Sequence, residues 1–435
     1  MTWPIPDPKT GLAKLDFRSG RIGNADAERQ HRTVAALLDR LGQQPGVVLA
    51  DEVGMGKTFV ALGAAYVTAL QDKGRNPVVV MIPPSLRDKW PRDADVFASH
   101  CVADGEPSPR FASAPTALDF YRLLDDPPGK RAQIIFLHHG AFHLQRIDHW
   151  TKLALMARAM HAMRLGEKRT ALPRYAGDIL RVKSVHRDPE LYDALLAARY
   201  EDWKEVINTH YKDRLDRQVQ DDPIPERVIH VLDRKELDLQ GLRESIRGLP
   251  ARDSANIESR LQAARNELQA SLKVLWPEVL QAARFRSPLL VLDEAHHLKN
   301  SETRLASLFS DESAEEAQML SGAFRGRFER MLFLTATPFQ LGHTELVNVL
   351  SRFRAVEWKT LPKSNAEQYD ATLKNLSQSL NTAQQVATEF DRMWQRIPTE
   401  SGPIAIDDGT VDLWWNEVKN TRGGDSPQLG AIVRS

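Results

Sequence analysis

The sequence has one cysteine, no long apolar run and no excess of charge of either sign. Its cysteine, Cys101, cannot form a disulfide within the chain and has no cysteine neighbour at metal-ligand spacing. A membrane-spanning helix needs roughly 20 consecutive apolar residues. The first residues also carry prolines and charges where a secretory signal is apolar. We therefore expect a cytoplasmic protein that does not span a membrane.

The balance of charge restricts how the protein could bind nucleic acid. Lysine and arginine together number 58, as do aspartate and glutamate, so net charge provides no general attraction to a phosphate backbone. Any binding of DNA or RNA must therefore use a local groove. The 435 residues allow two or three domains, since one domain usually has roughly 100 to 200 residues.

The apolar residues are grouped into short runs that predict buried strands. Small, polar or charged residues follow each run, which is typical of a parallel sheet covered by helices on both faces. We therefore predict an α/β fold whose functional residues gather at the carboxyl ends of the strands. The predicted strands are residues 47–50, 78–82, 134–137, 289–292 and 331–334.

Helix-favouring, charged sequence replaces this strand pattern between about residues 142 and 285. Its last part predicts one long amphipathic helix that begins after Asp253 or Ser254 and has a kink near Pro277. A second helix-prone region covers residues 366–396, and a polar tail follows it. The apolar positions of the long helix are Ile257, Leu261, Ala264, Leu268, Leu272 and Leu275.

The strongest signal for chemistry is the segment VVLADEVGMGKTFVAL, which predicts a buried strand, a turn with glycines and the start of a helix. Its glycines let the backbone N–H groups approach phosphate oxygens at a helix N-terminus. Lys57 would reach the β- and γ-phosphates, and the Thr58 hydroxyl would bind Mg²⁺. A chance Gly-Lys-Thr turn is the alternative, because the general pattern has glycine where Asp51 stands. The predicted nucleotide-binding residues here are Gly54, Met55, Gly56, Lys57 and Thr58.

The second signal is PLLVLDEAHHLKN, again a predicted buried strand that ends in acids. Asp293 would bind Mg²⁺, and Glu294 would polarise the water that attacks the γ-phosphate. An acid pair at a strand end can also be a helix cap followed by a solvated glutamate. The phosphate loop upstream favours the catalytic interpretation.

These segments resemble the motifs of a known family. DEVGMGKT, DEAHHLKN and LTATPFQ, in this order, resemble motifs I, II and III of the superfamily 2 helicases. The first two are similar to the Swi/Snf branch, because the Asp51-Glu52 pair and the continuation through Lys299 and Asn300 are marks of that branch. His297 stands where the branch usually has arginine. Bacterial members similar to the RNA-polymerase-recycling ATPase share the sequence LADEVG, which is residues 49–54 here.

The resemblance implies roles for further residues. Gln30 would read the edge of adenine, since an amide both donates and accepts; a surface glutamine on a helix is the alternative. The residues that would contact a nucleic-acid backbone are Ser85, Arg87 and Lys89, and Trp90 beside them is equally a packing residue. His296 would belong to the catalytic residues. Thr335 and Thr337, in a segment that contacts His296 in the family, would couple the γ-phosphate to the nucleic-acid path, although they could also form an ordinary turn.

We divide the chain accordingly into five parts. Residues 1–27 are a leader, residues 28–142 and 286–355 form one RecA-like lobe, and residues 143–285 are a mainly helical insertion. Residues 356–435 are a helical extension that leads toward a second RecA-like lobe, whose motifs IV to VI we do not find. In the family that lobe supplies an arginine finger, which contributes roughly 10³ to 10⁵ in rate by analogy with GTPases. We therefore expect this chain to hydrolyse ATP slowly by itself.

The insertion has basic and aromatic residues that leave three interpretations open. They could line a duplex groove, form a solvated helical face, which is the favoured alternative, or dock a partner protein. The residues concerned are Arg164, Lys168, Arg169, Arg174, Tyr175 and Trp203.

Taken together, the resemblance implies an ATP- and Mg²⁺-dependent translocase on double-stranded DNA. The second lobe would come from the same protein or from a partner subunit. The setting would be transcription recycling or bacterial anti-phage defence, of which we favour defence. One alternative is a strand-separating helicase or the motor subunit of a restriction complex. Another is a nucleotide-gated scaffold without efficient turnover.

Overall fold

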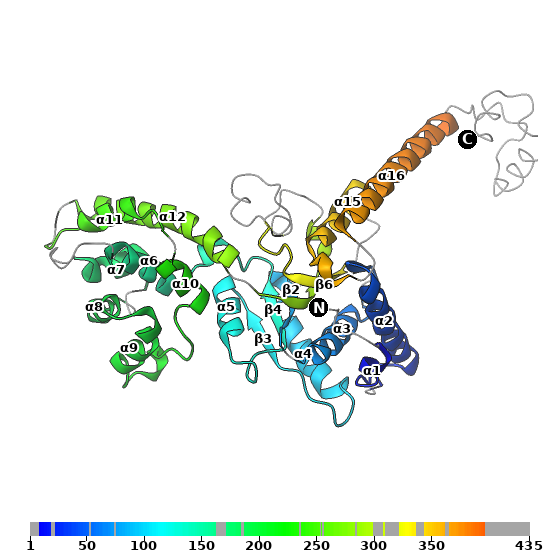
Figure 1. Ribbon diagram of the computed structural model, residues 1–435, viewed down its shortest axis with the longest axis horizontal. Coiled ribbons are helices and arrows are strands. Elements are labelled where there is room, and N and C mark those ends of the chain that lie inside the picture. Colours follow the sequence, from blue (N-terminus) through cyan, green and yellow to red (C-terminus); the bar gives the residue numbers. More distant parts are fainter. Residues whose placement is uncertain are drawn as a thin grey trace, which may run out of the picture.

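The computed structural model describes residues 8–18, 22–51, 54–73, 75–161, 171–183, 187–234, 236–252, 254, 256–282, 285–298, 308, 322–335, 343–361 and 365–395. In these residues a six-stranded, all-parallel sheet is flanked by helices (Figure 1), which confirms the predicted α/β fold class. No helix in this part of the chain combines the length and apolar character needed to cross a membrane.

The strand order across the sheet is β1-β6-β5-β2-β4-β3. The five predicted strands are confirmed within a few residues, whereas β3, at the edge of the sheet, was not predicted. The strands are β1 (Gly46–Leu49), β2 (Val78–Ile82), β3 (Phe111–Ala114), β4 (Ile134–His138), β5 (Ser287–Leu292) and β6 (Phe328–Leu334).

Alternate side chains of the central strands pack into two hydrophobic clusters, one on each face of the sheet. In β5, Leu289 and Val291 belong to the cluster that contains helices α2 to α4, while Leu290 and Leu292 belong to the other. This alternation is the period-two pattern of a strand buried on both faces. The helices around the sheet are α1 (Pro8–Leu12), α2 (Asn24–Gln43), α3 (Lys57–Gln71), α4 (Lys89–His100) and α5 (Ala117–Asp125).

The segment between β4 and β5 is helical, as predicted. The long helix expected at its end is α12, which continues through Pro277. The helices of the segment are α6 (His149–His161), α7 (Leu172–Leu180), α8 (Pro189–Ala197), α9 (Trp203–His210), α10 (Glu226–Arg234), α11 (Gln240–Arg247) and α12 (Ile257–Ala282). Short 3₁₀ helices cover Pro84–Leu86, Leu144–Arg146, Tyr200–Asp202, Leu215–Arg217, Ala295–Leu298, Arg352–Ala355 and Trp358–Thr360.

An aromatic cluster joins this helical segment to the sheet. Ring centroids lie 5.1 Å apart between Phe120 and Phe285 and between Phe142 and Phe324, and 5.2 Å apart between Phe324 and Phe328. All five rings belong to the same hydrophobic cluster as the buried side chains of α6 to α12. The helical segment therefore shares one continuous core with the sheet.

Two helices follow the sheet, α15 (His343–Ser351) and α16 (Ala366–Gln395). The second confirms the helix predicted for residues 366–396, and it projects away from the sheet (Figure 1). Its base is held by a hydrogen bond from the Tyr369 hydroxyl to the Leu350 carbonyl at 2.8 Å and by an ion pair between Arg354 and Asp370 at 2.9 Å.

A buried arginine on β6 connects three parts of the fold. The Arg330 guanidinium donates to the Leu41 carbonyl at the end of α2 and to the hydroxyl and carbonyl of Thr360. Its side chain is fully buried, and burial lowers the pKa of Arg330 to about 10. Such a residue is structural, because its donors satisfy carbonyls that no strand or helix pairs.

Candidate functional site

Most candidate residues lie at one edge of the sheet, where the carboxyl ends of β1, β6 and β5 meet. In the register of the sheet, Leu49 pairs with Leu334, and Phe333 pairs with Leu292. Neighbouring strands are about 4.8 Å apart, so the ends of β1 and β5 lie roughly 10 Å apart on either side of β6. The loop after β1 and the acid pair after β5 therefore leave the same edge of the sheet, on either side of the end of β6.

The loop after β1 has the backbone conformation that its glycines allow. Gly54 and Gly56 have φ angles of 88° and 80°, in the left-handed region that favours glycine. A Cβ atom on Gly56 would lie 2.2 Å from the Gln30 Nε2 atom, so the side chain of Gln30 covers this glycine closely. Helix α3 begins immediately afterwards at Lys57, and its N-terminus faces the loop.

Helix α2 holds this loop through two neighbouring residues. Gln30 is buried against Gly56, and Arg29 donates from Nη2 to the Met55 carbonyl at 3.0 Å. The sequence predicted a place for Gln30 beside this loop but not for Arg29, because nothing in the local pattern shows that an arginine of α2 reaches the loop. The candidate adenine-reading residue is therefore next to the candidate phosphate loop.

The side chains that begin α3 are half-buried at this edge. Lys57 and Thr58 occupy its first turn, where a helix N-terminus favours negative charge. The Lys57 ammonium donates to the Asp51 carbonyl at 2.6 Å. This bond holds the ammonium across its own loop, toward the end of β1.

Asp293 is held in place from two sides. The Trp90 indole N–H donates to Asp293 Oδ2 at 2.8 Å, and the Glu294 backbone N–H donates to Oδ1 at 2.9 Å. Burial raises the pKa of Asp293 above its ordinary value, and the hydrogen bond from Trp90 opposes this rise. A carboxylate in such a position gains when a cation replaces the lost water.

Glu294 and His296, both candidate catalytic residues, are in contact. Glu294 Oε2 lies 3.1 Å from His296 Nδ1, and both side chains are partly exposed. Glu294 has a φ angle of 52°, which is uncommon for a residue other than glycine. Strain of this kind is concentrated at functional sites, where surrounding contacts compensate for its cost.

The end of β6 is tied to the end of β1. Thr335 is buried, and its N–H donates to the Leu49 carbonyl at 3.1 Å. Thr335 therefore lies between the loop and the acid pair, as its candidate coupling role requires. Several other residues of the family motifs lie outside the described residues, among them Glu52, Lys299, Asn300 and Thr337, and so does the side chain of His297.

The three candidate nucleic-acid contacts follow β2, which is the neighbour of β5. Ser85, Arg87 and Lys89 are all exposed there, and Arg87 Nε lies 3.4 Å from Asp88 Oδ2. Trp90 differs from them, because its side chain is fully buried and its indole N–H is bound to Asp293. It is thus a site residue that the sequence left undecided between packing and nucleic-acid contact.

The structure bears on one of the three interpretations of the helical segment, in which its aromatic residues help to line a duplex groove. Trp203 is fully buried and Tyr175 is nearly so, and buried rings cannot stack on bases. Arg174 lies over the Tyr175 ring and donates to the Ala251 carbonyl. The other basic candidates of this segment, Arg164, Lys168 and Arg169, lie outside the described residues.

Comparisons with known proteins add no assignment. No protein-family model matches this chain, and a search of curated protein sequences also found no match.

Proposed function

We propose that this chain is the ATP-binding, RecA-like lobe of a Swi/Snf-type DEAH-box motor that acts on nucleic acid. One observation supports the proposal most directly: the loop with Lys57 and the acid pair Asp293 and Glu294 leave one sheet edge on either side of β6. A triphosphate with its metal ion needs both parts within reach.

The residues at this edge fit a nucleotide and Mg²⁺. Gly54 and Gly56 keep Cβ atoms away from the loop, so backbone N–H groups can approach phosphate oxygens. The Thr58 hydroxyl and the Asp293 carboxylate are the hard oxygen ligands that Mg²⁺ prefers, with phosphate oxygens and water completing its octahedron. Mg²⁺, when bound, would offset negative charge on the phosphate oxygens.

Each remaining side chain would then have a distinct task. Lys57 would exchange the Asp51 carbonyl for phosphate oxygens. Glu294 would orient the attacking water and take up its proton, and the contact with His296 would fix the direction of the carboxylate. Gln30 would bind adenine beside the loop, because α2 places it over Gly56.

Nucleic acid would bind next to the acid pair. Ser85, Arg87 and Lys89 are exposed where β2 ends, one strand away from β5, and cationic and hydroxyl side chains are usual ligands of backbone phosphates. We favour duplex DNA as the partner, with a second RecA-like lobe from the same protein or another subunit.

Calorimetry with Mg-ATP tests the nucleotide site. Lys57→Ala should abolish the binding heat, whereas Lys204→Ala, which replaces a half-buried lysine in the helical segment that is paired with Asp222, should leave it unchanged. Glu294→Gln should keep Mg-ATP binding and lower turnover by about 10² to 10⁴. The proposal fails if the unsubstituted protein gives no heat, or if the heat persists in Lys57→Ala.

ATPase measurements on this lobe together with the second RecA-like lobe, with duplex DNA, single-stranded DNA and RNA, test the motor. Stimulation by duplex DNA is expected, and stimulation by RNA alone would contradict the Swi/Snf assignment. Strand release in a fluorescent unwinding assay would indicate a strand-separating helicase. Mg-ATP binding without turnover on any nucleic acid would indicate a nucleotide-gated scaffold.

A further inference from the structure

A recess of about 300 Å³ lies in the helical segment, where α6, α7 and α12 (Figure 1) pack against one another. This volume is at the lower end of the usual range for small-molecule sites, roughly 300 to 1,000 Å³. None of its described lining residues belongs to the edge of the sheet where the candidate nucleotide site lies. The described residues that line the recess are Lys152, Ile179, Leu180, Arg181, Gln262, Arg265, Asn266, Leu268 and Gln269.

The described lining combines three kinds of side chain and contains no acid. Three of its residues are cationic, namely Lys152, Arg181 and Arg265. Three exposed amides follow one another along one face of α12, at spacings of four and three residues. Aliphatic side chains of α7 and α12, which are buried or half-buried, form an apolar wall. The amides are Gln262, Asn266 and Gln269, and the aliphatic residues are Ile179, Leu180 and Leu268.

Arg181 has a backbone conformation that glycine usually occupies. It follows the last residue of α7 with a φ of 54° and a ψ of 38°, in the left-handed region. Its N–H donates to the Asp178 carbonyl at 3.2 Å, and the Val182 N–H donates to the Gly177 carbonyl at 3.1 Å. Helices that end in this way commonly have glycine at the left-handed position, because a Cβ there costs free energy. Such strain is concentrated at functional sites, and here it belongs to a side chain that lines the recess.

Lys152 is half-buried at the recess. Burial lowers the pKa of its ammonium group, and the charge of Asp148 opposes this change. Asp148 is also bound to Arg122 at 2.5 Å and accepts a hydrogen bond from the Thr151 N–H at 2.8 Å. The counter-charge of Lys152 is therefore shared with two other groups. An anion in the recess would replace interactions with water that the ammonium loses by burial.

The two arginines of the recess differ in how their guanidinium groups are used. Arg265 pairs with Glu258 at 2.6 Å and donates to the Asp178 carbonyl at 3.1 and 3.3 Å, so it is a structural part of the wall. Arg181 donates from Nη2 to the amide oxygen of Gln262 at 3.4 Å. An amide oxygen orients a guanidinium but does not cancel its charge. Arg181 thus lines the recess with its positive charge in place.

Two further acids on these helices are directed to other groups. The Asp178 carboxylate is paired with Arg187 at 2.7 Å. The side chain of Glu267 lies against Gly241 of α11, where an added Cβ would be 2.2 Å from its Oε2 atom. Among the described residues, Arg181 therefore has no ion pair.

We propose that this recess binds a small organic carboxylate. Lys152 and Arg181 would donate charge-assisted hydrogen bonds to its oxygens. The three amides of α12 would bind its other polar groups, since an amide both donates and accepts, and the aliphatic wall would contact its carbon skeleton. A phosphate group carries about 1.5 to 2 charges and three acceptor oxygens, which suits an aliphatic wall with two available cations less well. This site does not depend on the proposed function.

Ligand-observed NMR on the full chain tests the proposal. The probes are a panel of small mono- and dicarboxylates, the neutral amides of the same acids, and inorganic phosphate. At least one carboxylate should bind at millimolar concentration, and its neutral amide should bind more weakly. Lys152→Gln should weaken carboxylate binding by about 10- to 100-fold, because it removes a charge-assisted hydrogen bond. Lys273→Gln, at an exposed lysine of α12 outside the described lining, is the matched control and should have no effect.

Arg181→Gly gives a second test, whose result a purely structural role would not produce. Glycine relieves the left-handed conformation, so the thermal midpoint of unfolding should rise. The affinity for the carboxylate should fall by about 10-fold, because the guanidinium is lost. A higher midpoint with unchanged affinity would contradict the role of Arg181.

Several results would overturn the proposal. Absence of binding by every carboxylate of the panel at millimolar concentration would do so, as would equal effects of Lys152→Gln and Lys273→Gln. Inorganic phosphate that binds more tightly than any carboxylate, with the same dependence on Lys152, would show a phosphate site instead. If Lys152→Gln does not fold, Arg181→Gly decides.

Discussion

Replacing Trp90 with phenylalanine tests whether the indole of Trp90, on α4, lowers the pKa of Asp293. The indole N–H donates to Asp293 Oδ2 at 2.8 Å, and this hydrogen bond stabilises the charged carboxylate. Trp90→Phe removes the donor and keeps an aromatic ring in the core. The pKa of Asp293, already raised by burial, should rise further.

The loss of this hydrogen bond should weaken the binding of Mg²⁺ and nucleotide. A hydrogen bond to a charged group contributes about 1.5 to 3 kcal/mol, so the affinity for Mg-ATP should fall by roughly 10- to 100-fold. Protonation competes with the metal as pH falls through the pKa of the folded protein. The acid limb of the binding profile should therefore move to higher pH in Trp90→Phe.

Trp276→Phe is a matched control within the same chain. Trp276 is also buried, and its indole N–H donates at 2.9 Å to the Phe142 carbonyl and not to a candidate site residue. Both variants lose one indole donor and similar volume. Binding of a fluorescent ATP analogue across pH and Mg²⁺ concentration would compare them after normalisation to the folded fraction. Equal effects of the two substitutions, or an acid limb that does not move, would refute the reasoning.

Three other substitutions test separate parts of the structure by chemical denaturation and nucleotide binding. Gly56→Ala adds a Cβ at a φ of 80° and 2.2 Å from Gln30 Nε2. It should lower the free energy of unfolding by about 1 to 3 kcal/mol and abolish nucleotide binding. Its control is Gly129→Ala, where a Cβ meets no atom within 4 Å, and this substitution should change neither property. Asp293→Asn should raise the free energy of unfolding at pH 7 on the order of 1 kcal/mol and abolish Mg²⁺-dependent nucleotide binding. Because the pKa of Asp293 is raised in the folded protein, the protonated carboxyl favours folding. The gain in free energy of unfolding from Asp293→Asn should therefore shrink as pH falls toward 3.8, the ordinary pKa of aspartate. A gain that persists at that pH would contradict this reasoning. Arg330→Met leaves buried carbonyls without donors and should cost about 3 kcal/mol without changing the nucleotide affinity of the folded fraction.

Much of the sheet could be predicted because its central strands are buried on both faces. Continuous apolar runs such as residues 78–82 and 289–292 are what that environment requires. Strand β3 was missed because it lies at the edge, where its sequence FASA mixes small, polar and partly exposed residues. The helices α12 and α16 were predicted because their apolar or polar periodicity extends over many turns.

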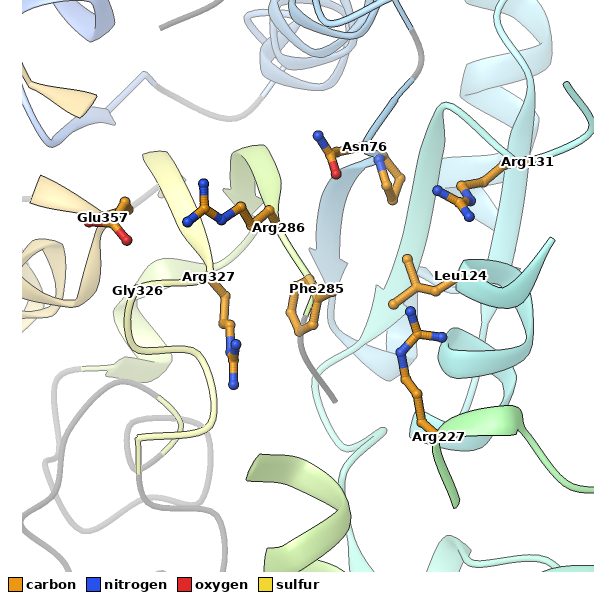
Figure 2. A pocket seen from close by; sticks show the side chains of 10 residues that line it. Asn76, Leu124, Arg131, Arg227, Phe285, Arg286, Gly326, Arg327 and Glu357 are labelled. Atoms are coloured by element: carbon orange, nitrogen blue, oxygen red, sulfur yellow. The ribbon is translucent and has the colours of Figure 1, made fainter. Parts of the chain in front are cut away.

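The candidate site was predictable only where its residues directly follow a strand in the sequence. Lys57 and Asp293 stand in local patterns that a reader of the sequence can recognise. Trp90 and Arg29 could not be assigned, because their partners lie 203 and 26 residues away and depend on how helices pack on the sheet. Arg131 and Arg327 likewise line one cavity (Figure 2) only because the strand order brings the starts of β4 and β6 to the same edge of the sheet.

Helix α16 is long enough to amplify a small rotation at its base into a larger displacement at its far end. Its 30 residues extend about 45 Å at 1.5 Å per residue, while its anchoring contacts, at Tyr369 and Asp370, are close to its first turn. A rotation of about 5° at that base would carry the far end through roughly 4 Å over this length. A displacement too small to disturb the packing beside the sheet would thus become a movement the size of a side chain at the tip.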